Sequence, residues 1–348
     1  MKIIKDIVGT ICFFLVGLLI FMGVGSVLGT DEEYSEMMFQ GYYAEQENII
    51  DAVFIGNSHI YKFWQPAFAW EEYGMASTEL ATSSMPGCTM KNVAIEALKT
   101  QSPKVIVIDI TPFANIDKEN NKVHLLLDNM KFSKNRLDLV ENFCKFTNVE
   151  GMDKMQYYFP IMQFHSRWKE LTNADFTQTR PSYLNSNYQK TFMKKLKEDV
   201  EHPTTEEREK IGEQNEAALL DLLEWCKNQK DVDFQFLAVP VVREKNLGRM
   251  NYVGDIVKEY GFDFVNYNEE GMFEIFDFNV KKDFEDVNHT NINGSYKFTK
   301  VYGEYLIERY GLADHRGESP YDSWDGKAEK YHSKIDKYFI YAEEKQEE

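Results

Sequence analysis

Short apolar runs alternate with amphipathic stretches along most of this chain. Four runs have the length and composition of buried strands: 51–56 (DAVFIG), 104–110 (KVIVIDI), 234–242 (FQFLAVPVV) and 261–267 (GFDFVNY). Apolar side chains recur at helical spacing in residues 90–100, 204–230 and 295–310. Strands that are apolar throughout and alternate with helices indicate a mostly parallel sheet covered on both faces. The pattern therefore predicts an α/β fold with a three-layer, doubly wound sheet.

The helix predicted at 204–230 carries a start signal of its own. Thr204 and Glu207 have the spacing of a capping box, in which the two side chains satisfy the first backbone N–H groups of a helix, and Pro203 precedes them. We therefore expect this helix to begin directly after Thr204.

The longest apolar run lies near the N-terminus. Residues 7–28 (IVGTICFFLVGLLIFMGVGSVL) contain no charged side chain, and a helix rising about 1.5 Å per residue over this length spans the hydrocarbon core of a bilayer. Lys2 and Lys5 precede the run, and an acidic triplet at 31–33 follows it. The positive charge before the run predicts an N-terminus in the cytoplasm and a chain that lies outside from residue 30 onward.

We therefore expect residues 1–29 to form an uncleaved, single-pass anchor in the cell membrane, and residues 30–49 to form a connector. The alternative is a cleaved signal peptide, for which residues 27–29 (VLG) offer a cleavage site.

Residues 50–312 hold the alternation of strands and helices and form the expected main domain. A helical, aromatic stretch at about 117–200 interrupts it and is interpreted as an insertion, which in α/β folds often covers the carboxyl ends of the strands. The polar tail at 313–348 has one apolar face, which predicts a helix docked on the domain. That face is formed by Trp324, Ala328, Tyr331, Ile335 and Phe339.

Charge and cysteine content exclude several classes of protein. The 348 residues carry a net charge of −18 and no cluster of Lys and Arg, which argues against a nucleic-acid partner because phosphates need clustered cations. Four Cys in a chain of this length do not form a disulfide framework. The seven His show no paired spacing typical of a metal site, so we expect no metal.

Candidate chemistry begins where the first strand of the main domain ends, at Gly56-Asn-Ser58. A serine at a strand-to-helix corner is exposed, and the start of the next helix offers backbone N–H groups to an oxyanion. The alternative is a serine that only caps that helix. His59 is expected to point away from Ser58, as neighbouring side chains do at the start of a helix.

The second half of the candidate site lies near the C-terminus, at Asp286-Val-Asn-His289. A carboxylate three residues before a histidine can accept a hydrogen bond from one ring nitrogen, which leaves the other nitrogen free to take a proton from a hydroxyl. Asp199 and His202 repeat the spacing within a charged run, where we expect a solvated surface pair remote from Ser58 and His289.

Together these residues resemble the SGNH (GDSL-like) hydrolase superfamily. Phe54-Ile-Gly-Asn-Ser58 matches the block that holds the nucleophilic serine of that family, and Asp286-x-x-His289 matches its C-terminal block. Residues 80–87 (LATSSMPG) are similar to the second block, whose glycine supplies an oxyanion N–H. The third block, Gly-x-Asn-Asp, is absent from residues 105–113 (VIVIDITPF), and Asn115 is the remaining candidate for its donor.

The resemblance covers about residues 50–112 and 215–312. It implies an SGNH/flavodoxin-like sheet, catalytic Ser58, Asp286 and His289, an oxyanion hole formed by the N–H groups of Ser58 and Gly87, and no cofactor. Within the insertion, His165, Arg167 and Trp168 are candidate substrate-binding residues, because aromatic faces stack on sugar rings and arginine binds carboxylate or phosphate. The alternative is an aromatic helix face buried against the sheet.

The layout of one anchor and one SGNH-like domain is similar to proteins of bacterial cell-wall D-alanylation and exopolysaccharide O-acetylation. This similarity implies a serine esterase or O-acyltransferase acting on acyl esters of a cell-surface polysaccharide or teichoic-acid-like polymer, with a membrane-bound O-acyltransferase as partner. The alternative is a non-catalytic module that binds polysaccharide or the acyltransferase.

Overall fold

A computed structural model of the chain describes residues 2–29, 33–114, 120–176, 194–197, 200, 202–243 and 245–339. It contains a five-stranded sheet in the order β2-β1-β3-β4-β5, and all neighbouring strands are parallel. The strands are β1 (Ala52–Gly56), β2 (Ser77–Ala81), β3 (Val105–Asp109), β4 (Asp233–Ala238) and β5 (Asp263–Asn266). This is the doubly wound order of flavodoxin-type sheets, so the predicted fold class is confirmed.

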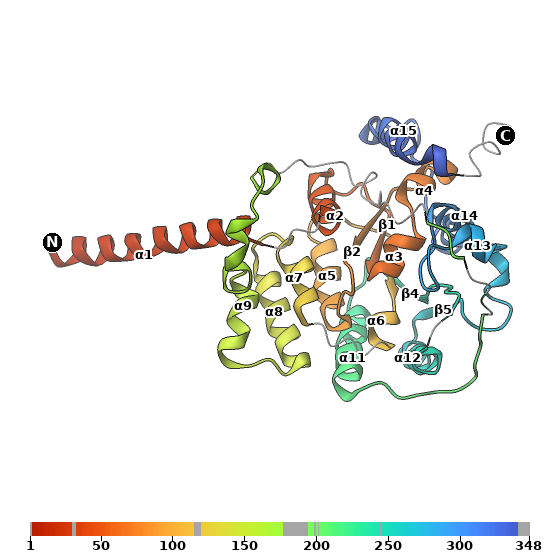
Figure 1. The fold of residues 1–348 in the computed structure, drawn as a ribbon, viewed down its shortest axis with the longest axis horizontal. Helices are drawn as coiled ribbons and strands as arrows, with labels where there is room; N and C mark the ends of the chain where they lie inside the picture. The colour runs from red at the N-terminus through yellow and green to blue at the C-terminus, as the bar shows by residue number, and fades with distance from the viewer. Residues whose placement is uncertain are drawn as a thin grey trace.

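Helices cover both faces of the sheet (Figure 1). Side chains alternate along each strand: Val53 and Ile55 face one layer, whereas Ala52 and Phe54 face the other. The first layer contains α2 (Glu33–Ala44), α5 (Met90–Ala97), α8 (Lys134–Thr147), α11 (Glu213–Lys227) and α12 (Leu247–Glu259). The second contains α3 (Ser58–Phe63) and α14 (Ile292–Tyr310).

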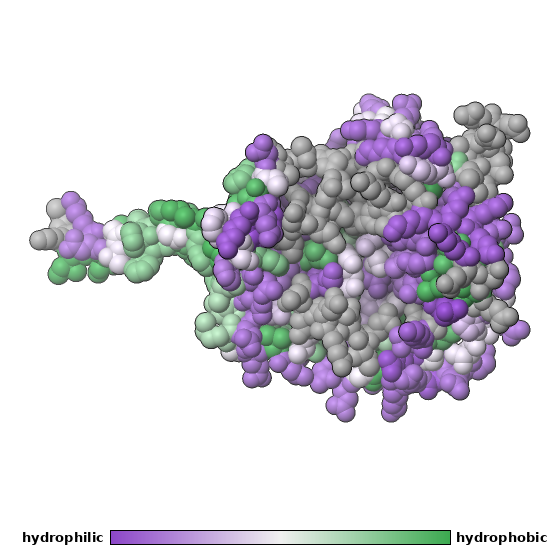
Figure 2. Space-filling model, viewed as in Figure 1, coloured by the Kyte–Doolittle hydropathy of each residue, from purple (hydrophilic) through white to green (hydrophobic). Residues whose placement is uncertain are grey.

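The first helix, α1 (Lys2–Val27), projects away from the sheet (Figure 1). Its segment Ile3–Gly25 is apolar and long enough to cross a membrane, and its most apolar stretch is not buried against the rest of the described structure. Figure 2 shows this helix as a mostly hydrophobic rod beside a largely hydrophilic domain.

Short helices connect the sheet elements on the side where α1 joins the domain. The chain between β3 and β4 contains α6 (Thr111–Ala114), α7 (His124–Leu127), α8, α9 (Met155–Tyr158), α10 (Ile161–Phe164) and the 3-10 helix η4 (His165–Lys169) before α11. No strand occurs in the described part of this stretch, residues 120–176.

The C-terminal part of the chain returns to the second layer. A short helix, α13 (Val280–Asp283), precedes α14, and α15 (Trp324–Ile335) packs against α4 (Pro66–Tyr73). The apolar face predicted for the tail is buried there: Trp324, Ala328, Tyr331, Ile335 and Phe339.

The capping box at Thr204 and Glu207 does not start a helix. Residues 202–212 are not helical, and α11 begins at Glu213. Tertiary hydrogen bonds replace the local ones, because the carbonyls of Thr205 and Glu207 accept from Asn251 Nδ2 on α12, and the Glu209 N–H donates to the Gly248 carbonyl. The segment therefore runs along α12 instead of forming the first turns of α11.

Candidate active site

The turn after β1 presents Ser58 at the carboxyl edge of the sheet. Ser58 is the first residue of α3, and the Asn57 side chain caps this helix by accepting a hydrogen bond of 2.8 Å from the His59 N–H. Gly56 allows the turn, because a Cβ there would lie 2.5 Å from Ile60 Cγ1 and 2.9 Å from Asp109 Cβ. A side chain at position 56 would therefore push the turn that carries Ser58 away from β3.

A tight loop before α14 carries the histidine. Phe284 and Thr290 form an antiparallel bridge, and the Glu285 N–H donates to the His289 carbonyl at 3.0 Å. Inside the loop, Asp286 Oδ1 accepts from the backbone N–H groups of Asn288 and His289 at 2.8 and 3.0 Å. The carboxylate is therefore held by its own loop, in the manner of an Asx-turn.

Ser58, His289 and Asp286 form one hydrogen-bonded chain. Ser58 Oγ lies 2.9 Å from His289 Nε2, although the two residues are 231 positions apart in sequence. The other ring nitrogen, His289 Nδ1, lies 3.0 Å from both carboxylate oxygens of Asp286. Ser58 and His289 are partly buried, and the Asp286 side chain is about half exposed, so the chain of residues opens to solvent.

The environment of Asp286 favours its ionised form. Burial acts to raise the pKa of this carboxyl, but the hydrogen bond and charge of His289 and the two backbone N–H groups outweigh burial and hold the pKa below its usual value. An ionised Asp286 accepts a hydrogen bond from Nδ1–H, which leaves the lone pair of Nε2 directed at Ser58 Oγ.

A buried ion pair fixes the serine helix to the histidine loop. Lys62 Nζ on α3 lies 2.9 and 3.0 Å from the two carboxylate oxygens of Glu285, and the side chains are only 4% and 8% exposed. The Lys62 carbonyl also accepts hydrogen bonds from the hydroxyls of Thr290 and Ser295. Burial lowers the pKa of Lys62, and Glu285 opposes that shift. Neither residue belongs to a motif, so this pair was not predicted from the sequence.

A second histidine and carboxylate lie next to Ser58. The His59 ring is 5.6 Å from the His289 ring, so His59 does not point away from the site as the sequence predicted. His59 Nδ1 lies 3.7 Å from Asp109 Oδ2 at the end of β3, and among the described residues neither of these buried atoms has a hydrogen-bond partner. The other oxygen of Asp109 accepts from the backbone N–H and hydroxyl of Thr111 at 3.0 and 2.6 Å.

The two N–H groups expected for an oxyanion hole are uncommitted. Within the described part of the chain, neither Ser58 N–H nor Gly87 N–H donates a hydrogen bond to another residue. Gly87 begins the 3-10 helix η1 (Gly87–Thr89), and a Cβ there would lie 2.8 Å from the Phe113 ring. Glycine is thus required for the close approach of η1 to the segment after β3. Asn115 lies outside the described residues.

The other candidate residues that the sequence indicated are not part of the Ser58–His289–Asp286 chain. His202 Nδ1 bonds the Val241 carbonyl at 2.8 Å and its ring stacks on Phe273, whereas Asp199 lies outside the described residues. His165, Arg167 and Trp168 belong to η4, next to the end of α1, and no contact recorded for the described residues joins them to Ser58 or His289. Their role in binding substrate stays a prediction.

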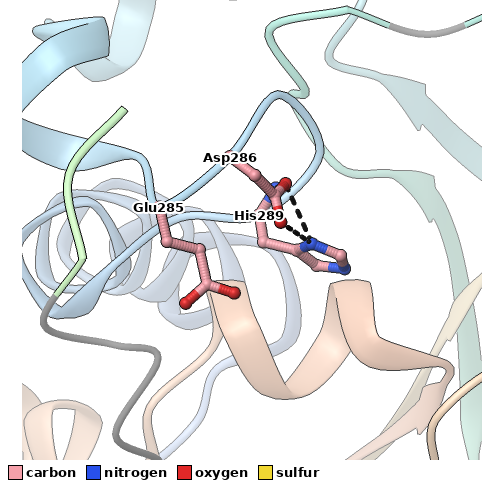
Figure 3. Close-up of side chains that lie close together, drawn as sticks. All are labelled: Glu285, Asp286 and His289. Carbon is pink, nitrogen blue, oxygen red and sulfur yellow. Dashed lines mark hydrogen bonds and ion pairs between the residues drawn. The ribbon is translucent and has the colours of Figure 1, made fainter. Parts of the chain in front are cut away.

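One cluster has ligand atoms close enough to share a cation. Glu285, Asp286 and His289 each offer an atom within 4.8 Å of the others. Figure 3 shows the Asp286 carboxylate over the His289 ring and the Glu285 carboxylate directed away from that of Asp286. Because Glu285 already binds the Lys62 ammonium, a cation there would face a positive charge. The arrangement fits a proton relay better than a metal site.

Comparisons with known proteins do not assign this chain to a family. No protein-family model matches the chain, and no curated protein matches it. Among solved structures, the chain is similar to a gut microbial diltiazem-metabolizing enzyme, with 12% sequence identity and a TM-score of 0.34. The match covers 77% of this chain and 47% of that one, so this chain spans about half the length of that enzyme. A likeness this distant says nothing about what the chain does.

Proposed function

We propose that this chain is a serine esterase or O-acyltransferase that works through an acyl-enzyme. The observation that supports it most is the hydrogen-bonded chain from Ser58 Oγ through His289 to Asp286, at 2.9 and 3.0 Å. A serine that only caps α3 needs no imidazole on its hydroxyl, and in this chain Asn57 already caps that helix.

In this mechanism Ser58 Oγ attacks the carbonyl carbon of an acyl ester while His289 Nε2 takes the hydroxyl proton. Asp286 keeps Nδ1 protonated and stabilises the imidazolium. The N–H groups of Ser58 and Gly87 bind the oxyanion, and His289 returns the proton to the departing alkoxide. Water then attacks the acyl-enzyme in an esterase, and a sugar hydroxyl does so in an O-acyltransferase.

The proposed substrate is an acyl ester of a cell-surface glycopolymer, either a polysaccharide or a teichoic-acid-like polymer, with a membrane-bound O-acyltransferase as partner. Two features support this setting. The apolar α1 suits a single-pass anchor, and the charges flanking it favour a cytoplasmic N-terminus with the domain outside. The resemblance of the Ser58, Gly87 and Asp286-x-x-His289 blocks to SGNH hydrolases supports the ester chemistry.

The test uses the full chain in detergent and two readouts. With p-nitrophenyl acetate as substrate and a fluorophosphonate as serine-directed label, the unmodified chain should hydrolyse the ester and gain the label on the peptide that contains Ser58. Ser58→Ala should do neither. The matched control is Ser102→Ala, because Ser102 is exposed and its hydroxyl only donates to Asn48 at 2.8 Å.

The outcome also separates the enzyme from a non-catalytic binding module. Equal labelling of the unmodified chain and Ser58→Ala would falsify the nucleophile assignment. A Ser58→Ala chain that still supported polymer modification in cells would favour the binding module.

A further inference from the structure

The end of α1 is packed against the helical segment between β3 and β4. The Phe21 and Phe159 rings lie 5.4 Å apart, and the backbone of Ile161 lies 3.8 Å from where a Cβ of Gly25 would be. The Arg167 guanidinium donates to the Gly29 carbonyl and also pairs with Asp175. The described segment 120–176 is therefore fastened to α1, and is not separated from it by a free linker.

These contacts set the depth of the segment relative to a membrane. Phe21 lies four residues inside Gly25, the last residue of the candidate span, which corresponds to about 6 Å along the helix axis. If α1 crosses a bilayer, as the proposed function has it, Phe159 and Ile161 lie at the level of the lipid headgroups or just below them.

Exposed apolar side chains gather on the same segment. Outside α1, the described chain exposes six large hydrophobic side chains, and only Ile275 lies elsewhere. The other five, 43–74% exposed, are Phe132, Met152, Met162, Trp168 and Phe176. Figure 2 shows hydrophobic side chains where α1 meets the domain. Exposed apolar side chains scattered singly over a surface need no explanation, whereas the concentration of five of the six in one segment points to an interaction of that segment.

The charge of the segment also differs from that of the rest of the chain. Residues 120–176 carry eight Lys and Arg against seven Asp and Glu, whereas the whole chain has a net charge of −18. Lys169 lies 5.7 Å over the Trp168 ring, so an exposed tryptophan and a cation occupy one site. Tryptophan and lysine are enriched together at membrane interfaces, where the ring enters the headgroup layer and the ammonium reaches water.

A cavity between α1 and the segment has an apolar lining, as a site for lipid requires. It encloses about 180 Å³ and is lined mainly by apolar side chains from both sides, including Phe21, Met22, Leu127, Met130 and Phe132. Because α1 itself forms one wall, lipid surrounding α1 has direct access to this space, and an acyl chain fits its lining.

We propose that segment 120–176 rests on the outer surface of the bilayer around α1, with Trp168 and its exposed apolar neighbours inserted among the lipids. The domain then has two attachments, one that spans the membrane and one that lies on it. This inference depends on α1 as a membrane span but not on the esterase chemistry. It also assigns Trp168 to lipid contact, in place of the sugar contact expected from the sequence.

The experiment reconstitutes the full chain into vesicles of phosphatidylcholine and phosphatidylglycerol, with or without bromine on the acyl chains. Bromine quenches tryptophan only at close range. The unmodified chain should lose emission in brominated vesicles, and Trp168→Phe should lose markedly less. Adding Phe176→Trp to Trp168→Phe should restore the quenching, whereas adding Ile275→Trp should not, because Ile275 is similarly exposed but lies outside the segment.

Flotation of the vesicles separates two kinds of failure. A chain that does not float with the vesicles overturns both the α1 anchor and the surface contact. A chain that floats, yet is quenched equally with and without Trp168, keeps the anchor and overturns the surface contact. Equal quenching of Trp at positions 275 and 176 would likewise overturn it. Ester hydrolysis by the same samples tests the proposed function independently.

Discussion

At the scale of single residues, Ser58 and His289 act as one unit in the proposed mechanism. Ser58→Ala and His289→Ala should each lower kcat by about a thousand-fold or more, and the double variant should be barely slower than either one, because each single change already stops acyl-enzyme formation. Asp286→Ala should be milder by roughly an order of magnitude, since this carboxylate orients the ring and takes no proton. Steady-state ester hydrolysis measures all four variants, and additive losses would contradict the shared step.

The Lys62–Glu285 pair should behave as a buried ion pair. Lys62→Met takes the ammonium away from the buried Glu285 carboxylate, and Glu285→Leu takes the carboxylate away from the buried Lys62 ammonium. Each change alone should cost about 3 kcal/mol of unfolding free energy. The double variant, which removes both charges, should recover most of that loss. The measurement is thermal or denaturant unfolding of the full chain in detergent.

An exposed ion pair provides the control for that cycle. Lys134 and Asp138 are paired on the surface of α8 with side chains 86% and 47% exposed, so removing either should cost less than about 1 kcal/mol. If the Lys62 and Glu285 losses simply add in the double variant, the two side chains are not coupled, and the link between α3 and the histidine loop is weaker than its geometry indicates.

Residues of the candidate site differ in how far the sequence could predict them. Ser58, Asp286 and His289 could be predicted because they belong to short sequence motifs at recognisable positions. One motif directly follows the first strand of the sheet, and the other precedes α14. The ion pair between Lys62 and Glu285 could not be predicted, because the two residues are 223 positions apart and neither belongs to a sequence motif. His59 lies near Asp109, at the end of another strand, and the sequence of α3 alone could not predict this neighbour.

At the scale of elements, two histidines link the C-terminal part of the chain to α4 and to the residue before β1. His315 lies 2.6 Å from Asp51 and 2.8 Å from Glu318, and His332 on α15 lies 2.8 Å from both Glu71 and Asp336. Burial acts to lower the pKa of both imidazoles, but the paired carboxylates outweigh it and raise each pKa above 6.5. Both rings are therefore charged over a wider pH range in the folded chain than in the unfolded one.

The docking of α15 should weaken with rising pH. A raised folded-state pKa gives stability that is fully present below the unfolded value of about 6.5 and is lost as pH rises through the folded value. Amide hydrogen exchange in α15, corrected for intrinsic rates, should therefore be slower at pH 6 than at pH 8.5. In a His315→Gln, His332→Gln chain the difference should disappear; faster exchange at pH 6 in the unmodified chain would contradict the assignment.

The sequence predicted secondary structure wrongly where tertiary contacts outweigh the local pattern. β2 has the sequence STELA, which is too polar to be predicted as a buried strand, yet all five residues are buried. Within it, the Ser77 hydroxyl accepts a hydrogen bond of 3.1 Å from the Trp64 ring N–H. The capping box at Thr204 has the correct spacing for a helix start, but the backbone there forms hydrogen bonds with α12 and no helix begins. Elements such as β1 and β3, whose residues are apolar except for Asp109 at the end of β3, were predictable because their burial determines their sequence pattern.

At the scale of the whole molecule, the proposed orientation can be tested directly. In the proposed orientation, which the charges around α1 favour, residues 30–348 lie outside the cytoplasm. Protease added to intact protoplasts should digest the domain while a cytoplasmic marker protein survives. A domain that resists until the cells are lysed shows the opposite orientation and rules out a cell-surface polymer as substrate.

The separation of Ser58 from His289 has a consequence for how the protein is made. The serine directly follows β1, whereas His289 lies 231 residues later, and α14 must pack on α3 before the two meet. A chain that is still being synthesised can therefore hold the Ser58 turn before His289 exists. The proposed activity begins only after nearly all of the domain has been translated and has folded, so under the proposed mechanism an unfinished chain cannot form an acyl-enzyme.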